Sequence, residues 1–149
     1  MMVLSHRALL AVAAVTDIAM HARPLPVAAK SLAARLELPP RHLETLLQAL
    51  VRAQILKGLR GPRGGYELAR ERRKITAAAI LQAVLSESAQ ENGQTTDSRL
   101  VSDVVAPMID AAGTAFMQQL ETITVEDICN RAERLRINED TAPGSDFAI

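Results

Sequence analysis

A glycine-rich segment with two arginines, RGPRGGYEL at residues 60–68, holds the residue types in this chain that best suit contact with phosphate groups. Its three glycines, which include Gly64, permit positive φ angles and close backbone approach, while Pro62 stiffens one corner. Arg60 and Arg63 place positive charge at the tip, where exposed amides can also donate to phosphates. A nucleotide-binding P-loop is the obvious rival, but neither GxxxxGKS nor GxxxxGKT is present. A cationic loop tip is therefore the favoured interpretation.

Strand candidates lie on both sides of the glycine-rich residues 60–65. The run 55–59 precedes them and the run 66–68 follows them, and both runs are short and carry apolar residues. Two such runs joined by a glycine-containing loop are typical of a β-hairpin. We therefore expect residues 60–65 at the tip of a two-stranded hairpin.

The segment RHLETLLQALVRAQ, directly before the hairpin, carries the clearest helical pattern in the sequence. Its apolar residues recur at i, i+3, i+4, i+7 and i+8, which places them on one stripe of a helix. The stripe consists of Leu43, Leu46, Leu47, Leu50 and Val51. We expect a helix over residues 40–53 whose stripe faces the core.

The opposite face of that helix gathers polar side chains. It holds Arg41, Thr45, Gln48 and Arg52, with His42 and Glu44 on its flanks. Arginine pairs with guanine acceptors or phosphates, glutamine can pair with adenine, and a threonine methyl group can touch thymine. Taken alone, the face is better interpreted as an ordinary solvated surface; the neighbouring elements reverse that interpretation.

Two more helices are expected before this one. Residues 5–21 are nearly continuously apolar, which indicates a helix buried on most sides, and VAAKSLAARLEL at 27–38 indicates a second helix. Pro39 and Pro40 end that helix and fit the first turn of the next. Two helices joined by a Pro-Pro turn and followed by a hairpin predict a mostly α, winged helix-turn-helix fold with residues 60–65 as the wing.

Charge divides the chain, although its formal net charge is zero. Residues 1–86 hold 13 Lys or Arg against 5 Asp or Glu, a net charge of +8, and residues 87–149 hold 4 against 12, a net charge of −8. The basic half suits nucleic acid, whereas the acidic half would be repelled by phosphates and must face elsewhere. On charge alone, two solvated surfaces without function stay an open alternative.

Cysteine content and hydropathy favour a cytoplasmic protein. The one cysteine, Cys129, cannot form an intrachain disulfide. Asp17 and His21 interrupt the apolar N-terminal run that could suggest a signal peptide, and no stretch reaches the roughly 18 apolar residues of a membrane span. No catalytic motif is present, so we expect no enzyme.

The C-terminal half predicts a long apolar helix followed by a shorter one. The helix LVSDVVAPMIDAAGTAFMQQLETI has an apolar face so broad that it needs a partner, and Pro107 should kink it or mark its true start. In the following segment, ITVEDICNRAERLRI, Cys129 lies directly after Ile128, which belongs to an apolar stripe that is expected to face the core. A buried inert thiol is therefore favoured over a redox sensor.

Residues 24–87 closely resemble the Rrf-two family of bacterial winged-helix transcription regulators. The resemblance rests on the block LPVAAKSLAARLELPPRHLETLLQAL, the hairpin ILKGLRGPRGGYELAR and the segment ITAAAILQAVLSE. It implies a homodimer whose third helix enters the major groove while the wing arginine, here Arg60, reaches toward the minor groove. The residues that it matches at the start of the recognition helix are Arg41, His42, Glu44 and Thr45.

The resemblance also implies a division of the chain. Residues 1–86 would form the DNA-binding domain, 87–98 an effector-type loop, 99–138 the dimerisation helix and a final helix, and 139–149 a flexible tail. In cluster-binding members the loop carries three cysteines that ligate an iron–sulfur cluster, whereas ESAQENGQTTDS contains none. We therefore expect no cofactor, and an unidentified small molecule or protein as effector.

These features predict a sequence-specific DNA-binding transcription regulator, best described as a repressor, that binds a roughly palindromic operator as a homodimer. Membranes are not among its expected partners. The expected DNA contacts are Arg41, His42, Glu44, Thr45, Gln48, Arg60, Pro62, Arg63 and Gly64. The alternative is a winged-helix module that binds protein and not DNA, and a steep loss of duplex binding with rising salt would separate the two.

Overall fold

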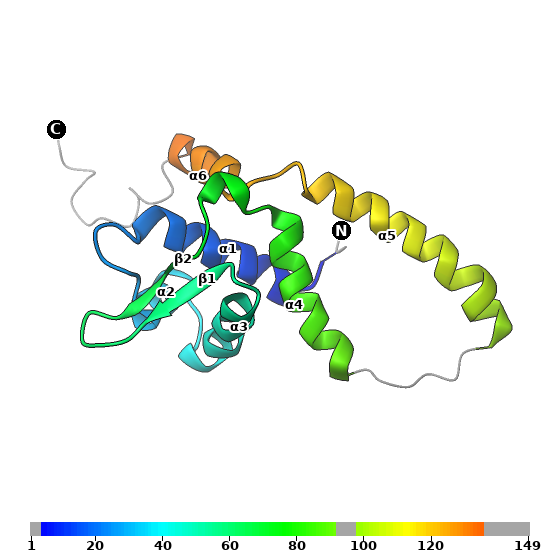
Figure 1. Ribbon diagram of the computed structural model, residues 1–149, viewed down its shortest axis with the longest axis horizontal. Helices are drawn as coiled ribbons and strands as arrows, with labels where there is room; N and C mark the ends of the chain where they lie inside the picture. The colour runs from blue at the N-terminus through cyan, green and yellow to red at the C-terminus, as the bar shows by residue number, and fades with distance from the viewer. Residues whose placement is uncertain (1–3, 92–97, 136–149) are drawn as a thin grey trace.

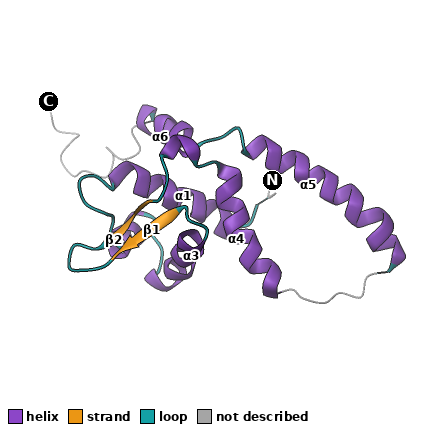
Figure 2. Cartoon of the chain, in the orientation of Figure 1, coloured by secondary structure: helices purple, strands orange, loops and turns teal. Residues whose placement is uncertain are grey.

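The computed structural model describes residues 4–91 and 98–135 as a mostly helical chain with one β-hairpin (Figures 1 and 2). The elements in chain order are α1 (His6–His21), α2 (Ala29–Arg35), α3 (Pro40–Arg52), β1 (Leu56–Leu59), β2 (Gly65–Leu68), the 3-10 turn η1 (Arg72–Lys74), α4 (Ala77–Glu91), the π-helical turn η2 (Val101–Val105), α5 (Ala106–Leu120) and α6 (Val125–Arg134). The predicted winged helix-turn-helix order of helix, helix and hairpin is confirmed.

Helix α1 forms the centre of the core. The Ser5 hydroxyl caps it by accepting a hydrogen bond from the Ala8 amide at 3.3 Å. Three of its alanines are fully buried together with Val15 and Ile18, and small side chains at these positions let neighbouring elements pack closely. It contacts α3, β2, α4 and α6. The long apolar run therefore corresponds to a helix covered on several sides, as predicted.

Helices α2 and α3 form the helix-turn-helix unit. Helix α2 is shorter than the predicted span 27–38 at both ends, because Val27 pairs with Tyr66 of the hairpin and Glu37 adopts a left-handed φ of 55°. Helix α3 begins at Pro40, where a missing amide proton costs no helical hydrogen bond. The predicted apolar stripe is buried at Leu43, Leu46, Leu47 and Leu50 and half-buried at Val51.

The hairpin pairs β1 and β2 in antiparallel register. Leu56 lies opposite Leu68, and Leu59 lies opposite Gly65. Val27 adds an isolated bridge to Tyr66 through two backbone hydrogen bonds of 2.8 and 2.9 Å. Strand β2 is thereby attached, near the tip of the hairpin, to the segment that leads into α2.

Helices α4 and α6 begin with side-chain caps. The Thr76 hydroxyl accepts a hydrogen bond from the Ala79 amide at 3.1 Å, which makes Thr76 the N-cap of α4. At α6, Thr124 and Asp127 form a reciprocal capping box. The hydrogen bonds with Thr124 lower the pKa of the Asp127 carboxyl, which stays ionised at neutral pH and faces the positive end of the helix.

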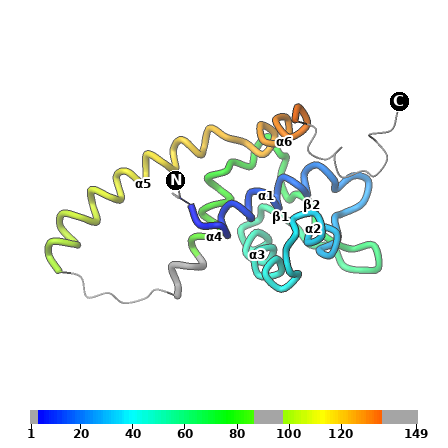
Figure 3. Tube along the Cα trace, turned by 180° about the vertical axis from the view of Figure 1, so that it is seen from behind, coloured from blue at the N-terminus to red at the C-terminus, as the bar shows by residue number. Residues whose placement is uncertain are grey.

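Helix α5 extends away from the body formed by α1 to α4, as the front and back views show (Figures 1 and 3). Pro107, which was expected to kink the predicted helix or to mark its start, lies in the first turn of α5, directly after the helical turn η2. Large apolar side chains on η2, α5 and the residue before them are exposed: Leu100, Val101, Val104, Val105, Met108 and Ile109. Within 4–91 and 98–135, no helix has the length and hydropathy needed to cross a membrane.

Candidate nucleic-acid interface

Helix α3 presents its polar face to solvent. The predicted contact residues on this helix, Arg41, His42, Glu44, Thr45 and Gln48, are all exposed. No side chain caps the start of the helix, where the His42 amide donates to the Pro39 carbonyl at 3.2 Å, and the positive end of the helix dipole lies beside Arg41. An anion is favoured at such a helix end, and the arginine adds a full positive charge there.

The tip of the hairpin is a narrow cationic turn. Arg60, Pro62 and Arg63 are exposed, and the Gly64 amide donates to the carbonyl of Gly61 at 2.9 Å. Gly61 has a φ of 115°, a conformation that side chains other than glycine rarely adopt. A Cβ at Gly64 would overlap the carbonyl oxygen of the residue at the end of β1. The glycines therefore allow a tight turn that carries the two arginines outward.

The recognition helix and the wing are joined by a short, hydrogen-bonded connection. The Ile55 amide donates to the Leu50 carbonyl of α3, and the Ala69 amide donates to the Ile55 carbonyl, both at 3.0 Å. Gln54 makes the bend with a φ of 61°, and Arg70 Nε donates to its carbonyl at 3.2 Å. These bonds hold the wing at a set position relative to α3. No local sequence signal indicated this role for Arg70.

A buried ion pair orients the helix-turn-helix unit against α1. Arg35 at the end of α2 donates two hydrogen bonds of 2.8 Å to the Asp17 carboxylate, one from Nε and one from an Nη atom. Asp17 is 9% exposed, and its hydrogen bonds raise the pKa of Arg35 above its ordinary value. His21 Nδ1 lies 2.9 Å from the Asp17 carbonyl oxygen. In the sequence, Asp17 stood out only as an interruption of the apolar N-terminal run, and nothing identified Arg35 as its partner.

The two sides of the molecule differ in charge. Helix α3 and the hairpin lie on one side of α1, whereas α5 and α6 lie on the other (Figures 1 and 3). Residues 40–68, which form α3 and the hairpin, carry five Lys or Arg against two Asp or Glu, whereas the described residues 98–135 carry three Arg against six Asp or Glu. The surface suited to phosphates therefore lies around α3 and the wing, and the more acidic surface lies at α5 and α6.

Cys129 lies in the interior, as the sequence predicted. Its side chain is fully buried on α6, its thiol faces the Thr16 carbonyl at 4.0 Å, and burial raises the pKa of the thiol. In the described parts of the chain, no group of three or more His, Cys, Asp or Glu could hold a metal ion. With one cysteine in the full sequence, and that one buried, the donor set does not fit a cluster held by cysteine thiolates.

Comparison with known proteins identifies relatives over most of the chain. Residues 4–131 match the family model Rrf2, described as "Iron-dependent Transcriptional regulator". The Synechocystis protein slr0846, named as a candidate HTH-type transcriptional regulator, is 34% identical over 119 residues, which cover 78% of this chain and 80% of that protein. The IscR regulator of Vibrio atlanticus is 34% identical over 74 residues, 50% of this chain and 43% of that protein, so the matched part spans less than half of that relative.

Solved structures give the same result. The structure of T. potens IscR superposes with a TM-score of 0.70 and 30% identity, covering 90% of each chain. CymR of B. subtilis, the global cysteine regulator, superposes with a TM-score of 0.65 and 24% identity, covering 88% of this chain and 98% of its own, a similarity of fold. The family match, the sequence relatives and the shared fold, taken with the winged helix-turn-helix geometry, show that this chain belongs to the Rrf2 family of transcriptional regulators.

Proposed function

We propose that this DNA-binding regulator inserts α3 into the major groove of its operator and places the wing at the minor groove. The observation that carries the proposal is the rigid connection between the exposed polar face of α3 and an arginine-tipped hairpin. Arg41 and Gln48 have side chains that read base edges, and Arg60 suits the strong negative potential of a narrow minor groove. The remaining proposed contacts are His42, Glu44, Thr45, Pro62, Arg63 and Gly64.

The protein acts as a homodimer in this proposal, with residues 99–138 as its dimerisation part. The exposed apolar residues of η2 and α5 form a surface that a soluble chain usually covers with a partner. An apolar groove of about 600 Å³ between α1, α4 and α6, lined by residues such as Leu9, Leu81 and Ile128, offers a complementary site on a second copy. A two-fold dimer would present two α3 helices to the half-sites of a palindromic operator.

Regulation in this proposal is repression of transcription, controlled by a signal other than a cysteine-ligated iron–sulfur cluster. The lack of thiolate ligands for a cluster supports this proposal, because the single thiol, Cys129, is buried on α6, far along the chain from the loop 87–98. Half of that loop, residues 92–97, lies outside the described residues. Since the proposed partner is the chromosome, the proposal places the protein in the cytoplasm.

Titration of duplex DNA over a series of salt concentrations tests the function. The operator is first selected by footprinting on genomic DNA, and its binding is then followed by fluorescence anisotropy with a scrambled duplex as control. Neutralised phosphates release counterions, so the logarithm of the association constant should fall linearly with the logarithm of salt concentration. Failure to bind any duplex, or binding that does not depend on salt, would contradict the proposal and favour a protein partner.

A further inference from the structure

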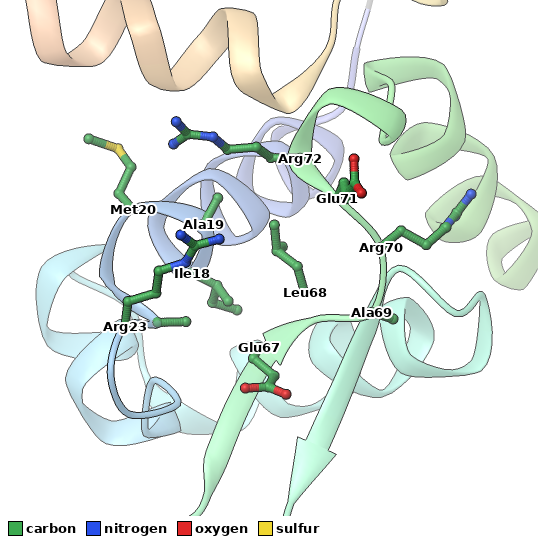
Figure 4. Close-up of a pocket in the computed structure, with 11 residues that line it drawn as sticks. Ile18, Ala19, Met20, Arg23, Glu67, Leu68, Ala69, Arg70, Glu71 and Arg72 are labelled. Atoms are coloured by element: carbon green, nitrogen blue, oxygen red, sulfur yellow. The ribbon is translucent and has the colours of Figure 1, made fainter.

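A polar pocket of about 530 Å³ lies between the C-terminal end of α1, the end of β2 and the start of η1 (Figure 4). None of the proposed DNA contacts lines it. Its charged lining residues are Arg23, Glu67, Arg70, Glu71 and Arg72. A concave site of this volume is large enough for a small metabolite.

The two carboxylates of this pocket already have counter-charges outside it. Glu67 forms an ion pair of 2.8 Å with Lys57 across the hairpin, and Glu71 forms one of 2.6 Å with Arg73. The Arg73 contact also lowers the pKa of Glu71, which stays ionised and paired at neutral pH. Neither Lys57 nor Arg73 lines the pocket, so the negative charge of the lining is offset from outside.

The positive charges of the pocket's arginines are less completely offset by neighbouring carboxylates. Arg70 is bonded to a backbone carbonyl and extends away from the pocket in Figure 4. Arg72 has its nearest carboxylate, that of Glu126, 4.0 Å away, and the Arg23 side chain has no ion pair or hydrogen bond within the described residues. Figure 4 shows Arg23 and Arg72 extending toward the same side of the pocket, near Met20. Within the described residues, Arg23 therefore lacks a counter-charge, and the counter-charge of Arg72 lies at the outer limit of an ion pair.

We propose that this pocket binds a small multivalent anion, a polycarboxylate or a phosphate compound, between Arg23 and Arg72. Guanidinium groups form forked, charge-assisted hydrogen bonds with both kinds of anion. A bound anion would also offset the repulsion between the two arginines. The apolar side chains of Ile18 and Leu68 in the lining suit the uncharged part of such a ligand.

The pocket is connected to the wing through β2. Glu67 and Leu68 belong to that strand, and the adjoining Tyr66 is paired with Val27, four residues after Arg23. An anion that draws Arg23 toward Arg72 would therefore act on β2 and on the segment that is paired with it. We infer that occupancy changes operator affinity; this coupling rests on the proposed function, whereas anion binding does not.

Isothermal titration calorimetry of the full chain with sodium citrate and sodium pyrophosphate tests the anion site, with ionic strength balanced by sodium chloride. Arg23→Gln and Arg72→Gln should each weaken binding about tenfold, because each removes charge-assisted hydrogen bonds. Lys74→Gln is the matched control, since Lys74 is an exposed cation of the same turn that does not line the pocket. Thermal unfolding confirms that the variants fold. Absence of saturable binding to either anion, or equal loss in all three variants, would overturn the proposal.

Operator binding with and without citrate at matched ionic strength tests the coupling. The wild-type affinity should change several-fold on addition of citrate, and that of Arg23→Gln should not. An unchanged wild-type affinity overturns the coupling. If Arg23→Gln and Arg72→Gln weaken operator binding strongly without any added anion, the arginines contact DNA phosphates and the small-anion site is wrong. If the wild type binds citrate but no duplex, the anion site holds and the proposed function fails.

Discussion

Replacement of Arg60 with alanine is the most direct test of the wing. Arg60 follows β1 at an exposed position, and its side chain has no ion pair or hydrogen bond within the described residues. The turn itself is held by backbone bonds, among them the 2.9 Å bond from Gly64 to Gly61. Truncation of Arg60 should therefore leave the fold and its stability unchanged and remove only a contact to DNA.

The expected loss is about 1–3 kcal/mol of operator binding free energy for each half-site, or roughly 5- to 150-fold in affinity. Because the minor-groove potential depends on groove width, the loss should be larger for the operator than for a scrambled duplex. Arg63 provides the contrast. If it contacts phosphate alone, Arg63→Ala should weaken all duplexes to a similar extent and reduce the salt slope by about 1.

Fluorescence anisotropy with operator and scrambled duplexes at several salt concentrations measures both effects, and thermal unfolding checks the fold. Arg99→Ala is the control, because the Arg99 side chain is 95% exposed and lies beside η2, on the acidic half of the chain. Operator affinity that is unchanged in Arg60→Ala would refute the wing assignment. An equal loss in Arg99→Ala would show that total charge, and not position, sets the affinity.

Four further predictions concern stability, assembly and the thiol. Asp17→Asn removes the counter-charge of Arg35 and should lower the free energy of unfolding, measured in urea, by about 2–3 kcal/mol. This loss is smaller than for a fully buried ion pair because Arg35 is partly exposed. An unaltered free energy of unfolding would show that the ion pair does not stabilise the fold. Gly65→Ala should destabilise the protein by more than about 1 kcal/mol, because the added Cβ would overlap a backbone carbonyl. A stability equal to the wild type would mean that β2 shifts freely against the segment that leads into α2. Burial raises the pKa of Cys129, so the thiol should react with iodoacetamide far more slowly in the native protein than in the unfolded chain, and rapid labelling of the native protein would contradict this. Because the unfolded state loses the thiol proton first, the free energy of unfolding should fall as pH rises above the pKa of the unfolded thiol. Ile109→Asp should convert the proposed dimer to a monomer in analytical ultracentrifugation, and a variant that still forms a dimer would show that the interface lies elsewhere.

The recognition helix and the wing were predictable because their signals are local. The apolar stripe of α3 has a helical period over several turns, and the element found, Pro40–Arg52, agrees closely with the predicted span 40–53. The hairpin was predictable because Gly61 and its neighbours permit a turn that other residues resist. The Thr76 cap belongs to the same class, since it depends on an amide three residues away.

The positions that depend on distant partners were not predictable. The sequence does not indicate that Arg35 pairs with Asp17, because the two are 18 residues apart and several other cations were equally available. The length of α2 was overestimated for a related reason. Val27 fits the sequence pattern of the predicted helix, but its backbone instead forms a bridge with the hairpin. A single sequence contains no local trace of such pairings.

By itself, the sequence determined the order of helices and hairpin, the polar face of α3, the cationic wing and the lack of cysteines for a cluster, because these follow from residue type and from spacing over a few residues. Tertiary structure decided how the wing is held against α3, how the buried ion pair orients α2, and which charges remain without partners. Packing brings Arg23 and Arg72, 49 positions apart in the chain, to one pocket while Glu67 and Glu71 are paired elsewhere. Net charge at a site depends on such pairings, and these exist only once the chain has folded.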